Sequence, residues 1–173
     1  MRKKIIKCCC IGERQQKFSH DYLNNTPVSY QKYLQKMENL IETHIKNGVF
    51  YFVCGAMNEV ELAFAETVLK LREKYPHIEL EIDLAFREQS IYFTQSERLR
   101  FKNILNRANT LLYLFNLCDY WTKTQRDYYI VDMSLHVIAV WNGERDNSVY
   151  QAITYAHKQE KQVDVITFSN VSN

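Results

Sequence analysis

The sequence predicts an α/β domain in which a mainly parallel sheet is covered by helices on both faces. Six apolar runs without polar alternation lie along the chain, and such runs are typical of strands buried on both faces. Between them lie segments whose apolar residues recur at the spacing of a helix. Because strand and helix alternate throughout, the pattern favours successive βα units and a parallel sheet.

The six apolar runs are the predicted strands. They cover residues 5–11, 49–54, 78–85, 110–115, 136–141 and 163–168. The chain of 173 residues has the length of one ordinary domain, and no linker, low-complexity tract or internal repeat divides it. We therefore predict a single domain over residues 1–173.

Three segments between the strands carry a helical pattern. Their apolar faces consist of Leu34, Met37, Ile41 and Ile45, of Leu62, Ala65 and Leu69, and of Phe101, Ile104 and Leu105. Capping-box spacing, in which a polar side chain precedes a carboxylate or amide by three residues, marks three helix starts. The pairs are Asn58 with Glu61, Thr94 with Glu97, and Thr122 with Gln125. Gly48 follows the first helical segment, where a C-terminal cap is expected.

The charge of the chain is close to balanced. Its 22 basic and 20 acidic residues give a formal net charge of +2, and no basic block extends beyond Arg2-Lys3-Lys4. This composition disfavours duplex nucleic acid as a partner. No apolar run approaches the roughly 20 residues of a membrane span, and no signal-length apolar segment precedes Cys8. We expect a cytoplasmic protein without a membrane partner.

The five cysteines do not form a metal-binding pattern. Cys8, Cys9 and Cys10 are consecutive, and neighbours in a strand point to opposite faces, so the three cannot all turn to one metal. Cys54 and Cys118 stand alone, no C-x-x-C pair occurs, and the five histidines are scattered. We predict reduced thiols that act as small apolar residues, with no metal and no cofactor.

Three of the four glycines point to a ligand site. Gly12, Gly55 and Gly143 each fall just beyond a predicted strand. In an open parallel sheet the carboxyl ends of the strands line the crevice where ligands bind, and glycine lets the backbone approach a ligand closely. The sequence therefore predicts a binding crevice at this edge of the sheet.

Several motifs around these glycines resemble those of a known family. Gly12-Glu13-Arg14 is similar to a T-G-H-R loop after the first strand, and Cys54-Gly55-Ala56 to an S-G-M or S-G-G turn after the second. Further matches in chain order are Val60-Glu61 with Glu66, Phe86 with Gln89, Gln125-Arg126 to Asp132, Ala139-Val140-Trp141-Asn142-Gly143, and Tyr155-Ala156. In this order and context the motifs resemble those of the SLOG superfamily, in its stand-alone YpsA-like branch.

The resemblance spans almost the whole chain and implies both a fold and a class of ligand. The fold is a single Rossmann-like three-layer domain with about six strands in the order 3-2-1-4-5-6. The ligands are nucleotides or nucleotide-derived molecules, since relatives include the DNA-processing protein DprA, cytokinin-releasing phosphoribohydrolases and sensor domains of bacterial conflict systems.

The chain departs from the family pattern at several positions. Ile11 replaces a threonine, Glu13 a histidine and Glu59 a glycine. After Gly143 relatives often have a G-G-T turn whose amides receive phosphate, whereas this chain continues Glu144-Arg145-Asp146-Asn147-Ser148. Ser148 with Arg145 is the alternative phosphate holder, and the carboxylates of Glu59 and Asp146 disfavour a highly anionic ligand.

The glycine positions and the resemblance together predict the ligand-binding residues. They are Gly12, Glu13, Arg14, Gly55, Ala56, Met57, Glu61, Tyr120, Trp121, Arg126, Asn142, Gly143 and Ser148. Each arginine has two interpretations, because it either clamps a phosphate or carboxylate or pairs with a protein carboxylate. For Arg14 that carboxylate is Glu13 or another surface acid, and for Arg126 it is Asp119 or Asp127.

The remaining candidates also have two interpretations each. Tyr120 and Trp121 either stack on a base or pack over the end of the sheet. Glu61 either caps its helix or binds a ribose hydroxyl.

Three functions are compatible with these residues. The first, which we favour, is a module that binds or senses a nucleotide-derived small molecule. The second is a hydrolase of an N-glycosidic bond that uses Glu61 or Glu59. The third is a DprA-like binder of single-stranded nucleic acid, which near-neutral charge disfavours. Tyrosines beyond those needed for one helix face, namely Tyr30, Tyr33, Tyr128 and Tyr129, also predict a homodimer.

Overall fold

The sheet has six strands, and all of its pairings are parallel. The computed structural model describes residues 5–13, 28–116, 119 and 121–167. The strands are β1 (Lys7–Gly12), β2 (Tyr51–Cys54), β3 (Glu79–Leu84), β4 (Thr110–Tyr113), β5 (His136–Trp141) and β6 (Gln162–Thr167). Each predicted apolar run overlaps one of them, which confirms the α/β class.

The strand order differs from the expected one. The sheet runs β4-β3-β2-β1-β5-β6, so the fourth strand lies outside β3 and not beside β1, and the predicted order 3-2-1-4-5-6 is wrong. The reason is the helix α3 (Gln95–Arg107), which packs against the neighbouring helix α2 (Glu59–Leu71) on the same face and carries the chain one strand further outward. The strand that returns to the other side of β1 is therefore β5 and not the fourth strand.

The position of β4 at the edge also changes its burial. The apolar run predicted a strand buried on both faces, but Leu111 is 39% exposed and Tyr113 is 45% exposed. An edge strand has a neighbour on one side only, and here that neighbour is β3. The expectation of two-sided burial is therefore wrong for this strand.

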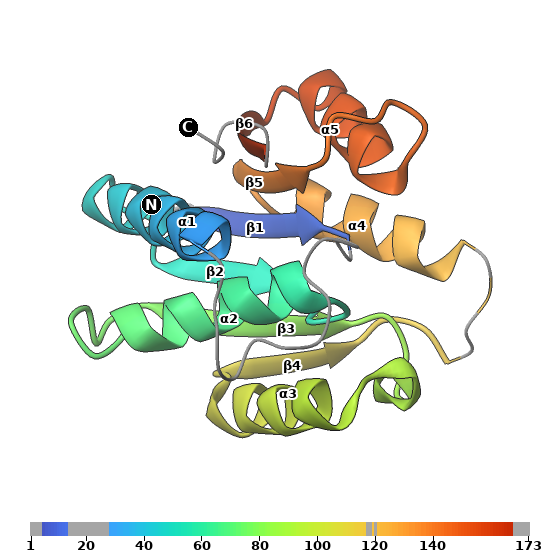
Figure 1. The fold of residues 1–173 in the computed structure, drawn as a ribbon. Helices are drawn as coiled ribbons and strands as arrows, with labels where there is room; N and C mark the ends of the chain where they lie inside the picture. The colour runs from blue at the N-terminus through green and yellow to red at the C-terminus, as the bar shows by residue number, and fades with distance from the viewer. Residues whose placement is uncertain (1–4, 14–27, 117–118, 120, 168–173) are drawn as a thin grey trace.

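The helices form two layers, one on each face of the sheet (Figure 1). One face is covered by α1 (Val28–Lys46), α2 and α3, and the other by α4 (Thr122–Asp132) and α5 (Ser148–Lys158). A short 3-10 helix, η1 (Gln89–Tyr92), follows β3. Within the described ranges, no helix has the length and apolar character needed to span a membrane.

The consecutive cysteines fill both layers of the core. Cys8 and Cys10 pack with the α1–α3 layer, and Cys9 packs with the α4–α5 layer. All three are fully buried, unbridged thiols, and burial raises the pKa of Cys9 to about 12. The prediction that they serve as small apolar residues of the first strand is confirmed, while Cys118 lies outside the described residues.

The helix boundaries partly follow the predicted caps. Thr94 and Glu97 form a reciprocal capping box at α3. Gly48 has a φ of +89°, and Val49 N–H donates to the His44 carbonyl at 3.0 Å, which is the hydrogen bond of a Schellman C-cap. The prediction for Thr122 is wrong, because this residue is the first of α4 and its hydroxyl bonds Asp119 instead of capping the helix.

Two of the tyrosines that suggested a homodimer lie within the core. Tyr33 is 1% exposed, and Tyr30 is 6% exposed and donates to the Glu59 carboxylate at 2.6 Å. Tyr128 stacks on Tyr155. These side chains are therefore used within the chain, so the homodimer stays a prediction with less support from the tyrosines.

Candidate functional site

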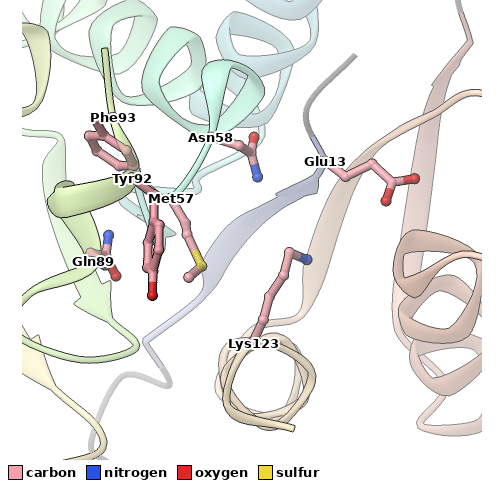
Figure 2. A pocket seen from close by; sticks show the side chains of 7 residues that line it. All are labelled: Glu13, Met57, Asn58, Gln89, Tyr92, Phe93 and Lys123. Carbon is pink, nitrogen blue, oxygen red and sulfur yellow. The ribbon is translucent and has the colours of Figure 1, made fainter. Parts of the chain in front are cut away.

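A crevice lies at the carboxyl ends of the first three strands. It has a volume of about 320 Å³ and is lined by Glu13 after β1, Met57 and Asn58 after β2, Gln89, Tyr92 and Phe93 after β3, and Lys123 in the first turn of α4. In Figure 2 the side chains of Tyr92, Met57 and Lys123 point into the same space from three different elements. A cavity of this size suits a small ligand.

The glycines after β1 and β2 permit close packing of the protein on itself. A Cβ atom on Gly12 would lie 2.2 Å from Cγ1 of Val60, and one on Gly55 would lie 1.4 Å from Nη1 of Arg126. The close approach at these two positions is therefore to a helix residue and a guanidinium group. Gly143 differs, because its φ of +94° lies in the left-handed region that favours glycine.

The turn after β2 is held in an unusual conformation. Ala56 has a φ of +49°, which a residue with a side chain adopts at a cost and which often marks a functional site. The buried amide of Gln89 donates to the Gly55 carbonyl at 2.9 Å, and the Met57 N–H donates to the Glu61 carboxylate at 2.7 Å. These bonds fix the turn and place the Met57 side chain in the crevice.

Asn58 joins two walls of the crevice. Its side-chain oxygen accepts from the N–H groups of Val60 and Glu61, which caps α2, and its Nδ2 donates to the Gly12 carbonyl at 2.8 Å. The predicted cap is confirmed, but the reciprocal half of the box is not formed, because the Glu61 carboxylate accepts from Met57 instead. One side chain thus ties the end of β1 to the start of α2.

Replacing Asn58 with alanine is expected to lower the free energy of unfolding by about 1–3 kcal/mol, because a helix cap and a hydrogen bond to a buried carbonyl are both lost. Urea denaturation measures the change. Asn58→Ser keeps a capping oxygen but cannot reproduce the bond to Gly12, so we expect an intermediate loss. An alanine variant as stable as the parent protein would contradict this role.

A buried ion cluster lies beneath the turn. The guanidinium of Arg126 donates to both carboxylate oxygens of Glu61, at 2.7 and 3.1 Å, and to Asp127 at 2.6 Å. Arg126 and Glu61 are 0% exposed and Asp127 is 1% exposed. Burial by itself would lower the pKa of Arg126, but the charges of Glu61 and Asp127 raise it overall, so the guanidinium stays charged and paired.

This cluster gives Arg126 a protein partner that one interpretation expected, and it gives Glu61 a partner that neither of its interpretations expected. Arg126 pairs with Asp127, as one interpretation expected, and also with Glu61, which sequence reasoning did not foresee. Since the polar atoms of Arg126 and Glu61 meet inside the protein, both residues act as positioning groups for the turn after β2. A direct contact with a ligand would require this pair to open.

Lys123 presents a positive charge at the wall of the crevice. Its Nζ donates to Asp127 at 2.7 Å and to the Ser148 hydroxyl at 3.3 Å, and its side chain is 26% exposed. Glu13 also lines the crevice, and burial raises the pKa of its carboxyl group. The positive charge of Lys123 lowers this pKa, whereas the neighbouring carboxylates raise it further, namely Glu144, Asp127 and Asp146.

Two further candidates, Glu59 and Trp121, are not among the residues that line this crevice. The Glu59 carboxylate pairs with Arg100 at 2.5 Å and accepts a hydrogen bond from the Tyr30 hydroxyl. Both partners belong to the α1–α3 layer. Trp121 is 57% exposed at the start of α4. Arg14 and Tyr120 lie outside the described residues.

The loop after β5 leads to Ser148, whose hydroxyl accepts a hydrogen bond from Lys123 at the wall of the crevice. The Asn142 side-chain oxygen accepts from the Glu144 N–H at 3.0 Å and the Asn147 amide at 2.8 Å, which shapes the turn at Gly143. Among the described residues no group of three or more histidine, cysteine or carboxylate side chains could hold a metal ion.

Sequence reasoning missed Tyr92, Phe93 and Lys123. The first two follow the Phe86–Gln89 match, so an aromatic pair directly after a family motif was the available signal. For Lys123 the signal was its spacing of four residues from Asp127.

The fold defines a Rossmann-like α/β protein, and its crevice lies at the carboxyl ends of the strands, where open α/β sheets commonly bind ligands. The chain belongs to the YspA SLOG family, whose model matches residues 20–171. This confirms the resemblance seen in the motifs.

Relatives in two bacteria are similar over most of the chain. A UPF0398 protein of Halalkalibacterium halodurans is 27% identical over 154 residues, which cover 84% of this chain and 75% of the relative. The SPbeta prophage-derived protein YoqJ of Bacillus subtilis is 25% identical over 139 residues, covering 73% of this chain and 79% of the relative.

A solved structure shares the fold. DNA processing protein A from Helicobacter pylori, described for its single-stranded DNA binding mode, superimposes with a TM-score of 0.61 at 17% identity. The match covers 94% of this chain but spans only 65% of the Helicobacter chain.

Proposed function

We propose that this protein binds a nucleotide or nucleotide-derived small molecule in the crevice after β1, β2 and β3, and that it acts as a binding or sensing module. The observation that carries the proposal is the pairing of an exposed aromatic ring with a cation in one cavity. Tyr92 is 68% exposed and lines the same crevice as Lys123. A base stacks on such a ring, and an ammonium group binds a phosphate as a point charge.

The comparisons support a ligand of this class. The SLOG match covers most of the chain, and the structural neighbour is described for binding single-stranded DNA, a polymer of nucleotides. A single strand is therefore included among the ligands to be tested.

The carboxylates of the hydrolase alternative face away from the crevice or are enclosed. Glu59 is held by Arg100 and Tyr30, and Glu61 by Arg126 and the Met57 N–H. A general acid or base must reach the reacting bond within hydrogen-bonding distance. Neither carboxylate lines the crevice, and this favours binding without turnover.

Thermal unfolding in the presence of adenine nucleotides, ADP-ribose, cyclic nucleotides and short single-stranded DNA tests the proposal. A ligand at 100 times its dissociation constant stabilises the folded state by about 2.7 kcal/mol. We expect Tyr92→Ala to weaken the bound ligand about 5- to 150-fold, as the loss of one stacked base costs about 1–3 kcal/mol.

Ile91 provides the matched control. It precedes Tyr92, is 58% exposed and does not line the crevice, so Ile91→Ala should leave the affinity unchanged. Equal losses in the two variants, or no stabilisation by any ligand of the panel, would contradict the proposal.

A further inference from the structure

We infer that the groove between α4 and α5 is a second binding site, which takes an unpaired nucleobase together with its phosphate. The groove has a volume of about 290 Å³. It is lined by three tyrosines (Tyr128, Tyr150 and Tyr155), by the cations Arg145 and Lys158, and by two uncharged polar residues of α5. It shares no lining residue with the crevice, so this inference does not depend on the proposed function.

The aromatic rings of the groove are fixed before any ligand arrives. Tyr128 and Tyr155 stack with centroids 4.2 Å apart and planes 19° apart, and the Tyr155 hydroxyl donates to Asp132 at 2.8 Å. Tyr150 stacks on Trp141 at 5.6 Å and 26°. Rings already held by packing lose little conformational entropy when a ligand binds. They offer stacking surfaces suited to the π-face of any base.

The charges of the groove complete the match to a nucleotide. No carboxylate is among the lining residues, and Arg145 and Lys158 are both exposed. The carboxylate of Asp132 accepts a hydrogen bond from the Tyr155 hydroxyl at 2.8 Å. Aromatic faces beside two cations suit a planar ring that carries an anion, and an unpaired nucleotide is such a group.

The nucleotide can be a free molecule or one unit of a single strand. A fluorescein-labelled thymidine oligonucleotide of about 12 units, within the range of single-strand sites, reports binding by anisotropy, and unlabelled thymidine monophosphate serves as competitor. If the monophosphate displaces the oligonucleotide from the protein, a free nucleotide is sufficient for binding. Binding of the oligonucleotide alone assigns the groove to strands.

Two kinds of variant test the groove. Arg145→Gln with Lys158→Gln removes both cations, and we expect at least a tenfold loss of oligonucleotide affinity and a salt slope smaller by about 1.4, the value for two phosphate contacts on a single strand. The control is the double variant Lys102→Gln with Arg107→Gln, which makes the same charge change at exposed positions of α3 on the other helix layer. We expect it to lose only a small part of the oligonucleotide affinity. Tyr150→Leu should weaken binding about 5- to 150-fold, and Tyr150→Phe should restore it.

Four results would overturn the inference. The first is equal affinity in the two double variants, and the second is equal affinity in the leucine and phenylalanine variants of Tyr150. The third is no binding of either probe by the parent protein at low salt. A loss confined to Tyr92→Ala would place the nucleotide in the crevice alone and would overturn the inference as well.

Discussion

Replacing Arg126 with methionine is expected to lower the free energy of unfolding by about 3–5 kcal/mol. The substitution leaves Glu61 buried without its cationic partner, and breaking a buried pair from one side is strongly destabilising. Urea denaturation measures the loss. Lys70→Ala is the control, because it breaks an exposed ion pair with Glu38, and exposed pairs contribute little.

A second variant separates the ion pair from simple loss of packing. Adding Glu61→Leu to Arg126→Met removes both charges of the pair, so the double variant should regain part of the stability that the single variant loses. Double and single variants of equal stability would contradict the view that the unpaired Glu61 charge causes the loss.

Replacing Asp83 with asparagine is expected to stabilise the protein at pH 8 by about 2–4 kcal/mol. Asp83 is fully buried in β3, and neither carboxylate oxygen has a hydrogen-bond partner among the described residues. Burial raises the pKa of Asp83 from 3.8 to about 7, the neighbouring Glu81 adds to the shift, and Lys7 and Arg126 oppose it.

The sign of the pH dependence follows from this pKa. Because the folded state holds the proton more tightly than the unfolded state, stability from this group falls as pH rises from about 4 to about 7 and then levels off. The advantage of Asp83→Asn should therefore shrink below pH 7 and vanish below about pH 3, where Asp83 is protonated in both the folded and the unfolded state. Urea denaturation across this range measures the difference, and a constant difference would contradict the account.

Sequence reasoning found the elements of the fold because local pattern determines them. The run at His136–Trp141 became β5 with the predicted bounds, and the alternation of Cys8 and Cys9 between two layers follows from strand geometry. The order of the strands was not readable, since β4 has the same apolar character as the interior strands. Its place at the edge depends on how α3 packs.

The sequence predicted a crevice at the carboxyl ends of the strands, and one lies after β1, β2 and β3, but of the predicted binding residues that the structure describes only Glu13 and Met57 line it. Gly143 belongs to the loop after β5, which does not line the crevice, whereas Gly12 and Gly55 lie at the end of β1 and directly after β2. Their partners, Val60 and Arg126, could not be found from the sequence, because Gly55 and Arg126 are far apart in the chain and meet only in the folded protein. For the same reason Arg126 was considered as a ligand clamp, although Glu61 already neutralises it.

The central claim is that a nucleotide-derived ligand occupies the crevice, and methionine methyl NMR tests it most directly. The chain has four methionines, of which Met57 lines the crevice, Met37 lies in the core and Met133 lies just after α4 with 49% exposure. With ¹³C-methyl methionine, the ligand of the panel that stabilises the protein most should shift the Met57 signal and leave Met37 and Met133 in place. A Met57 signal that does not move at saturation would contradict the claim.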